Sequence, residues 1–182
     1  NTLNQICQVR FIRFSARVAQ RQVCYNGVRC MGIDHFQGGY AFPMQAPAND
    51  PYRDFASSYR YFFAGFGVHD PAYADLFRGL FGWHGVRRVL DCACGIGQDL
   101  HLFHTLGCEV HGSDISTAML TEARRNLAAV GLELPLTQAD FRELPTHFDA
   151  QFDAVVCLST SLPHLLEDAE LLRALRSMRA VL

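Results

Sequence analysis

Lysine is absent from this chain of 182 residues, and all sixteen of its basic residues are arginine. Eighteen acidic residues leave a formal net charge of -2, which argues against general binding to nucleic acid or to a membrane surface. No apolar run reaches the length of about 18 residues that a membrane-spanning helix needs. Seven cysteines are present without any pair of Cys-x-x-Cys motifs. We therefore predict no zinc site and expect reduced cysteines in a cytoplasmic protein.

Acidic residues are also missing from the first 33 positions, which hold five arginines. Such a composition is typical of a mitochondrial transit peptide. The segment contains a single serine, Ser15, and lacks a clear apolar face, so we favour a poorly ordered N-terminal extension over residues 1–50. Residues 51–182 then form the folded part. The chain is 49% hydrophobic and 19% charged, which is the composition of an ordinary globular protein.

The stretch from Val89 to Gln98 predicts a buried strand, a glycine turn and the start of a helix. Gly95 and Gly97 lie in the turn, where glycine allows positive φ and lets a ligand approach the backbone. The first turn of a helix adds N–H groups without helical partners and the positive end of the helix dipole. We therefore predict a nucleotide-like ligand at this corner. A plain tight turn between strand and helix is the competing interpretation.

A carboxylate follows at a suitable distance. Cys108–Asp114 predicts a second strand that ends on Asp114, 17 residues after Gly97. In nucleotide-binding βαβ units, an acid about 20 residues after the glycines accepts hydrogen bonds from ribose hydroxyls. Asp114 fits that role. Alternatively it caps the next helix, although Ser116 is itself a suitable cap.

The rest of the folded part alternates between strand and helix patterns, which predicts an α/β fold with a parallel sheet and right-handed crossovers. A helix should follow the glycine turn directly. The other expected elements are the helices Tyr52–Phe63 and Pro71–Phe81, the latter ended by Gly82, then the helix Thr117–Val130 ended by Gly131, the strands Leu134–Gln138 and Phe152–Leu158, and the helix Glu167–Leu182.

Four ordered motifs resemble class I S-adenosylmethionine-dependent methyltransferases. They are Asp91-x-Ala93-x-Gly95-x-Gly97, Asp114-Ile115-Ser116 with Met119-Leu120 and Ala123, Gln138-Ala139-Asp140-Phe141, and the strand Phe152–Leu158. The loop after that strand, Cys157–Leu165, is similar to the one in glycine and sarcosine N-methyltransferases, with Ser159 and Thr160 in place of the Gly-Asn pair common there. The resemblance covers about residues 52–182 and implies a Rossmann-like class I methyltransferase fold.

The resemblance implies S-adenosylmethionine as the cofactor. Gly95 and Gly97 would admit its methionine part, Asp114 would bind the ribose, and Asp140 would accept from the adenine amino group. Helices before the first strand would form a lid over it. The full set of expected cofactor contacts is Tyr59, Asp91, Ala93, Gly95, Gly97, Asp114, Ile115, Met119, Ala139, Asp140, Phe141 and Cys157. Of these, Asp91 would order the turn or meet the ammonium group, and Met119 or Phe141 would pack on the adenine ring.

Methyl transfer from a sulfonium needs little acid–base help, because the carbon is already activated and the leaving group is a neutral thioether. Placement and shielding from water matter more. We expect His164 and Thr160 beside the acceptor, in the loop where ligands of open α/β sheets bind. The resemblance implies a small-molecule acceptor, most simply an amine, rather than nucleic acid.

Two other functions stay open. An NAD(P)-dependent oxidoreductase shares the strand, the turn and the acidic second strand, but the small residue expected three positions after Gly97 is Leu100 here. Members of the resembling family continue for about three more strands, so we expect a C-terminally truncated, cofactor-binding part of a longer domain. A catalytically inactive cofactor-binding fragment is therefore the second alternative. Its last apolar strand would lie at an open sheet edge and promote self-association.

Overall fold

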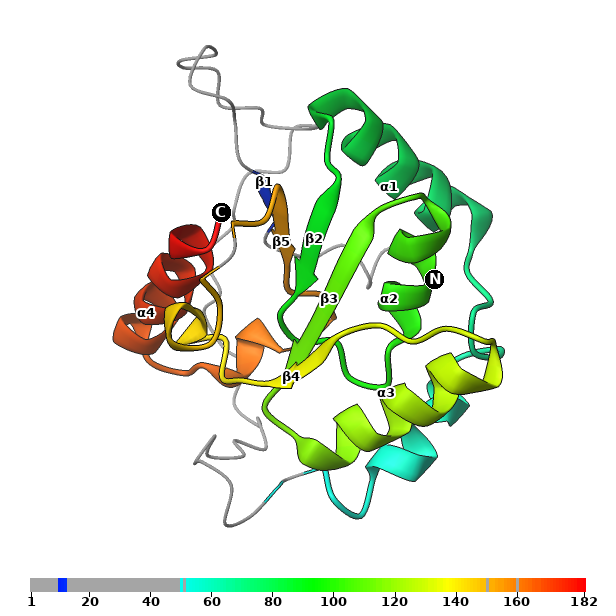
Figure 1. Cartoon of the computed structure of the whole chain (residues 1–182). Coiled ribbons are helices and arrows are strands. Elements are labelled where there is room, and N and C mark those ends of the chain that lie inside the picture. The colour runs from blue at the N-terminus through cyan, green and yellow to red at the C-terminus, as the bar shows by residue number, and fades with distance from the viewer. Residues whose placement is uncertain (1–9, 13–49, 51, 150, 160) are drawn as a thin grey trace, which may run out of the picture.

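The computed structural model describes residues 10–12, 50, 52–149, 151–159 and 161–182. A five-stranded sheet of order β1-β5-β2-β3-β4 forms its centre (Figure 1). The parallel strands are β5 (Ala154–Val156), β2 (Arg88–Asp91), β3 (Glu109–Asp114) and β4 (Leu136–Gln138). The fifth, β1 (Arg10–Ile12), pairs with β5 in the antiparallel direction. Four strands are parallel, and helices lie between them in the chain, so the predicted α/β fold is confirmed.

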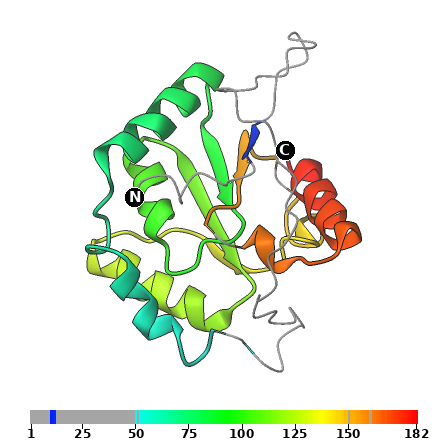
Figure 2. The same cartoon turned by 180° about the vertical axis from the view of Figure 1, so that it is seen from behind.

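Helices cover both faces of the sheet (Figures 1 and 2). One face carries α1 (Pro71–His84), α2 (Gln98–Thr105) and α3 (Thr117–Ala129), and the other carries α4 (Asp168–Ala180). Three short 3₁₀ helices lie in the connections: η2 (Ala56–Phe62), η3 (Leu144–Thr146) and η4 (Leu162–His164). The arrangement places the carboxyl ends of β2, β3, β4 and β5 along one edge.

Two hydrophobic cores follow from the alternation of side chains along the strands. Val89 of β2 packs with α1, α2 and α3, whereas its neighbour Leu90 packs with α4. Both side chains are fully buried. A strand buried on both faces is continuously apolar, which explains why the Val89–Leu90 segment could be recognised from the sequence.

Two predicted helix details were wrong. Gly82 does not end α1, which continues to His84 and stops at Gly85, where φ is 63°. A helix often ends where a glycine takes the left-handed conformation, and Gly85 is the residue that takes it here. The expected helix Tyr52–Phe63 is reduced to η2, in which the Tyr59 and Phe62 rings are in tilted contact with centroids 5.4 Å apart. The eclipsed i and i+3 positions of a 3₁₀ turn favour that contact.

The edge of β5 is not open along Ala154–Val156, contrary to the expectation from the sequence. Arg10–Ile12 pair with it, because the N–H and C=O groups of an apolar edge strand need partners. The rest of the expected poorly ordered extension, residues 1–9 and 13–49, lies outside the described residues.

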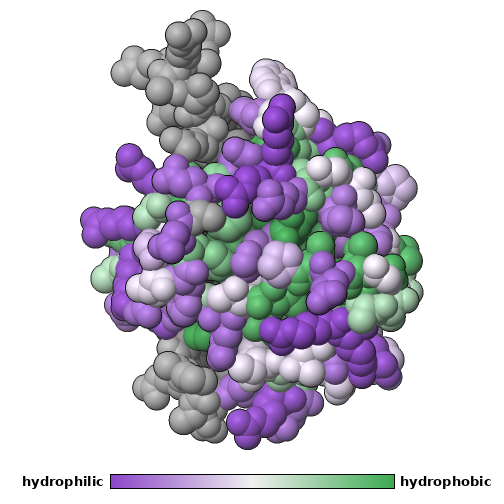
Figure 3. Space-filling view, viewed as in Figure 1, coloured by the Kyte–Doolittle hydropathy of each residue, from purple (hydrophilic) through white to green (hydrophobic). Residues whose placement is uncertain are grey.

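No helix in the described part of the chain is long and apolar enough to cross a membrane. On the face seen in Figure 1, hydrophilic side chains surround a smaller apolar area near the middle and right (Figure 3).

Candidate functional site

The glycine turn connects β2 to α2 at the carboxyl edge of the sheet. Asp91 ends β2, and its carboxylate accepts the Ala93 N–H at 3.2 Å. Gly95 and Gly97 take φ of 52° and 86°, conformations that cost a residue with a side chain free energy. Gly97 is the N-cap of α2 and supplies no side-chain acceptor for the first N–H groups of that helix. The turn therefore offers backbone donors and room for close approach.

Asp114 ends β3 beside this turn. Its carboxylate accepts the Gly95 N–H at 2.8 Å and the Ser116 N–H at 2.9 Å, so it joins the glycine turn to the start of α3. Burial raises the pKa of Asp114, although the hydrogen bonds from Ser116 and Gly95 oppose this. The cap of α3 is Ser116, whose hydroxyl accepts the Met119 N–H at 3.0 Å. The alternative role of Asp114 as that cap is therefore wrong.

Negative charge is concentrated around the turn. Burial raises the pKa of Asp91 well above its ordinary value, and the neighbouring Asp99 and Asp114 raise it further. Burial also raises the pKa of Asp99 to about 6, although the Tyr73 hydroxyl donates to its carboxylate at 3.1 Å. Carboxylates that repel one another in a buried site favour a cationic ligand.

Among the described residues, no group of three or more His, Cys, Asp or Glu is arranged to hold a metal ion. A Cβ built on Gly95 would meet no atom within 4 Å, so there is open space beside the turn.

An aromatic lid covers the turn. It consists of Tyr52, Tyr59 and Phe63, which pack against Ile96 of the turn and Met119 of α3. Phe55 and Phe62 contact Tyr59 from the outer side and are exposed. Burial raises the pKa of both tyrosines, and the nearby Asp114 raises it further in each case. The Tyr59 ring therefore lies near Asp114 and packs against the turn.

The remaining expected cofactor contacts divide between two layers. Met119 packs under the lid, whereas Ala139, Phe141 and Cys157 are buried in the core against α4. Met119 and Phe141 therefore do not share one surface. Ala93 and Ile115 are partly exposed near the turn and after β3. Asp140 is also partly exposed, and Arg142 holds its carboxylate with Nε at 2.9 and 3.0 Å from the two oxygens.

The expected acceptor loop follows β5. Ser159 takes φ of 61°, the single positive φ of a non-glycine residue in the described part of the chain. Such strain clusters at functional sites. His164, in η4, lies with Nε2 3.3 Å from the Tyr52 hydroxyl, so the lid meets this loop. Thr160 lies outside the described residues.

Several site residues escaped the sequence argument. Asp99 could have been found, because an acid in the first turn of the helix after Gly97 is visible in the sequence. Gln98 could not: its side chain is buried and donates to the carbonyls of Gly65 and Val68 at 3.2 and 2.9 Å, which fixes the segment behind the lid. The contacts of Asp50 and Tyr52 were equally hidden, because their partners are distant in sequence.

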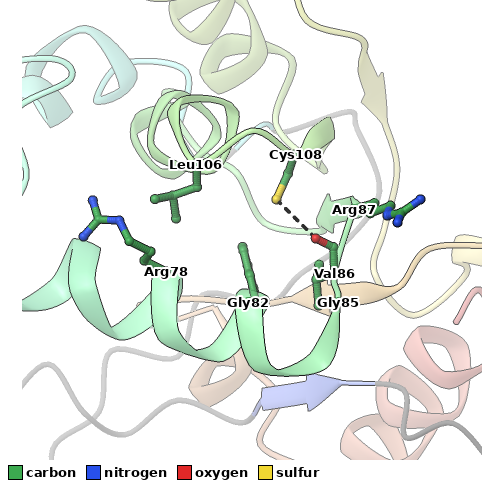
Figure 4. Close-up of a pocket in the computed structure, with 8 residues that line it drawn as sticks. Arg78, Gly82, Gly85, Val86, Arg87, Leu106 and Cys108 are labelled. Carbon is green, nitrogen blue, oxygen red and sulfur yellow. Dashed lines mark hydrogen bonds between the residues drawn. The ribbon is translucent and has the colours of Figure 1, made fainter.

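Two cavities lie away from this site. One of about 280 Å³ is bounded by α1 and the start of β2, with Arg78 and Arg87 on opposite sides and the Cys108 thiol donating to the Val86 carbonyl (Figure 4). The other, of about 290 Å³, includes Arg88 and Glu109 at the starts of β2 and β3. Both lie toward the edge of the sheet opposite to the glycine turn, so neither contributes to the candidate site.

Known proteins share this fold and parts of this sequence. The chain is 38% identical over 116 residues to a glycine/sarcosine N-methyltransferase of Parasynechococcus marenigrum, covering 61% of this chain and 39% of that protein. A sugar N-methyltransferase from a Streptoalloteichus species is 30% identical with a TM-score of 0.55, covering 86% of this chain and 56% of that chain. A SAM-bound amino pentose methyltransferase from Micromonospora echinaspora is 26% identical with a TM-score of 0.57, covering 81% and 55%.

The chain spans 37 to 39% of the length of three curated methyltransferases that it matches. A family model described as a methyltransferase domain matches residues 89–182, from the middle of β2 to the last residue. This match extends over more than half of the chain and includes the glycine turn, Asp114, Asp140 and the loop after β5. The chain therefore belongs to the methyltransferase domain family.

Proposed function

We propose that this chain binds S-adenosylmethionine at the carboxyl edge of β2, β3 and β4, and that the protein methylates the nitrogen of a small amine. The observation that carries the proposal is the trio Asp91, Asp99 and Asp114 around the glycine turn and under the aromatic lid. S-adenosylmethionine carries an ammonium and a sulfonium group, and both charges suit a buried acidic site. The family match and the SAM-bound relative support the same ligand.

Each contact has a physical reason. The N–H groups at the start of α2 suit the ligand's carboxylate, Asp91 suits its ammonium group, and Asp114 suits the two ribose hydroxyls. Asp140 follows β4, next to Asp114 along the edge, and suits the amino group of adenine. Tyr59 and the other lid aromatics exclude water from the site, which strengthens the attraction between the acids and a cation.

When bound, S-adenosylmethionine supplies an activated methyl group and leaves as a neutral thioether. The residues of this chain place the acceptor and hold its proton. His164 suits both tasks, because it follows the strained Ser159 and faces the Tyr52 hydroxyl. The acceptor is proposed to be an amine because relatives include a glycine/sarcosine N-methyltransferase and a sugar N-methyltransferase. Thr160, in the same loop, is proposed to contact the acceptor.

Calorimetric titration with S-adenosylmethionine, S-adenosylhomocysteine and NAD tests the cofactor. We expect the first two to bind and NAD to show no heat. Asp114→Asn should raise the Kd for S-adenosylhomocysteine about 10- to 100-fold, because the ribose hydroxyls lose a charged acceptor and one of its two oxygens becomes an NH₂ donor. Binding should also tighten between about pH 5 and pH 7, since a cation favours the ionised form of Asp99.

Asp153→Asn is the matched control. Asp153 also accepts two backbone N–H bonds, from Arg87 and Arg88 at 2.9 Å each, but at the opposite edge of the sheet. Both substitutions should lower the stability of the fold, while only Asp114→Asn should raise the Kd for the ligand. An equal Kd for the two variants would remove Asp114 from the site.

Transfer of a labelled methyl group to glycine, sarcosine, an amino sugar and RNA tests the acceptor. We expect methylation of at least one small amine and none of RNA, with His164→Ala reducing kcat more than it raises KM. Methylation of RNA alone would overturn the acceptor and leave the cofactor proposal intact. Ligand binding without any transfer would favour the cofactor-binding fragment instead.

A further inference from the structure

The side chain of Asp140 is held in one orientation by its neighbour Arg142. Arg142 donates from Nε to both carboxylate oxygens, from Nη2 to Oδ2 at 2.5 Å, and from its backbone N–H to Oδ1 at 2.8 Å. The two side chains are only 16% and 17% exposed. The guanidinium fork takes the inner lone pairs of the carboxylate and the backbone N–H takes a second lone pair of Oδ1, which leaves an outer lone pair of Oδ2 in a fixed direction.

Arg142 is itself anchored to the first turn of α4. Its Nη1 lies 2.6 Å from Oε2 of Glu170. The hydrogen bonds with Asp140 and Glu170 raise the pKa of the guanidinium, so its charge is permanent. A second ion pair, Arg173 with Glu143, and the bond from the Leu144 N–H to the Ser177 hydroxyl join the same loop to α4. The loop therefore stays attached to α4 through contacts that do not involve Asp140.

Asp140 lies at the carboxyl edge of the sheet, after β4 and next to Asp114. The Ala139 N–H donates to the Asp114 carbonyl at 3.1 Å, so the loop after β4 begins directly beside the acid assigned to the ribose. With the ribose at Asp114, as proposed above, a base that extends from β3 toward β4 would reach Asp140. Its edge would meet a carboxylate that can only accept hydrogen bonds.

We propose that Arg142 is a positioning residue that fixes Asp140 as a hydrogen-bond acceptor and so makes the site select a 6-amino purine over a 6-oxo purine. This inference rests on the proposed cofactor. A 6-amino group donates to the fixed carboxylate, whereas a 6-oxo group presents a second acceptor that the carboxylate repels. Without the fork, the Asp140 side chain can turn away, and the penalty against the oxo group is lost.

The test compares the Kd values of S-adenosylhomocysteine and S-inosylhomocysteine, measured by calorimetry on the whole chain. The wild type should prefer the adenosyl compound about 10- to 100-fold. Arg142→Ala should reduce this preference to about threefold or less, mainly by raising the Kd of the adenosyl compound. Arg142→Lys keeps the charge and the fold but lacks the fork, so it should also lose most of the preference.

Arg173→Ala is the control, because it removes the ion pair with Glu143 and a longer contact with Glu170 at 3.9 Å but leaves the bonds of Arg142 to Asp140 and Glu170 in place. Its preference should equal that of the wild type. A purely structural role for Arg142 would raise both Kd values equally and leave their ratio unchanged. That result would overturn the inference. Full preference in Arg142→Lys would overturn it as well. Absence of binding by either compound to the wild type would instead overturn the proposed function.

Discussion

Gly95 and Gly97 both take positive φ, but their surroundings differ. A Cβ on Gly97 would lie 3.3 Å from the Ala123 Cβ, whereas one on Gly95 would meet no atom within 4 Å. Alanine at either position adopts a left-handed conformation at a cost of about 1–2 kcal/mol. At position 97 it must also displace α3. The two glycines therefore differ in their surroundings: Gly97 is closely packed against α3, whereas the space beside Gly95 is open.

We expect Gly97→Ala to lower the free energy of unfolding more than Gly95→Ala does, by about 1–2 kcal/mol beyond the shared strain. Gly95→Ala should instead raise the Kd for S-adenosylhomocysteine by at least about tenfold, because the alanine methyl group would enter the space proposed for the ligand. Urea denaturation and calorimetry on both variants measure the two quantities. Equal losses of stability would contradict the packing argument for Gly97.

Asp99 makes stability depend on pH. Burial raises its pKa in the folded state to about 6, whereas the unfolded chain ionises it near 3.8. Between these values the folded state holds a proton that the unfolded state has released. The contribution of this carboxyl to folding therefore falls as pH rises from about 4 to about 6, then levels off. A difference of about two pH units corresponds to at most about 3 kcal/mol.

Asp99→Asn should accordingly be almost neutral near pH 4 and stabilise the fold by about 1–3 kcal/mol near pH 7.5. Urea denaturation of wild type and variant at several pH values measures the difference. Asp75→Asn, which removes an exposed acid paired with Arg78 on α1, is the control and should show no such gain. A gain that is the same at both pH values would argue against a buried, proton-bearing Asp99.

The N-terminus of α3 depends on a residue outside every described helix. The Asp50 carboxylate accepts the Ala118 N–H at 3.0 Å, the Ser116 hydroxyl at 2.8 Å and the Tyr52 N–H at 2.9 Å. Burial acts to raise the pKa of Asp50, but the hydrogen bonds from Ala118, Ser116 and Tyr52 outweigh it and lower the pKa. Its stabilising contribution is therefore present above about pH 4 and disappears as pH falls through the lowered value.

Asp50→Ala should lower the free energy of unfolding by about 0.5–2 kcal/mol near neutral pH, as the loss of a helix cap does. The difference from wild type should shrink at strongly acidic pH. Asp54→Ala removes an exposed acid four residues away and should change stability little. A loss caused by Asp50→Ala that persists undiminished in acid would mean that the charge of Asp50 does not act on α3.

The helices α1 and α2 share one aromatic cluster over the sheet. Phe103 lies 4.9 Å from Phe77 and 5.2 Å from Phe81, measured between ring centroids, and all three side chains are buried. Phe103→Ala should cost about 3–5 kcal/mol, which is a large part of the 5–15 kcal/mol typical of a whole domain. We expect one cooperative transition at lower temperature, with ligand binding lost in the same transition.

Calorimetry in the presence and absence of S-adenosylhomocysteine would show that transition. Phe62→Ala is the control, because the Phe62 side chain is 71% exposed and its loss should leave the melting temperature nearly unchanged. Two separate transitions in Phe103→Ala would mean that the two faces of the sheet unfold independently.

Local interactions explain what could be predicted from the residues alone. The apolar run before Gly95, the glycines with positive φ, the Ser116 cap and the Gly131 stop are decided by neighbours in the chain, and all lie where the sequence placed them. The parallel direction of β2, β3, β4 and β5 also followed, because strands that alternate with helices favour a parallel sheet. The end of α1 was not decided by the sequence, because Gly82 and Gly85 both suit a helix stop. In the structure, Gly85 takes the left-handed conformation and ends the helix.

Contacts between distant residues could not be predicted, because they leave no periodic pattern. Asp50 reaches Ser116 across 66 positions, and Tyr52 reaches His164 across 112. Arg142 and Glu170 are likewise brought together by the packing of α4 on the sheet. The motif residues Asp91, Asp114 and Asp140 were visible in the sequence. The folded chain alone placed Asp99 beside Asp91, closed the lid over the turn and fixed the orientation of Asp140, since burial and charge depend on which segments meet in space.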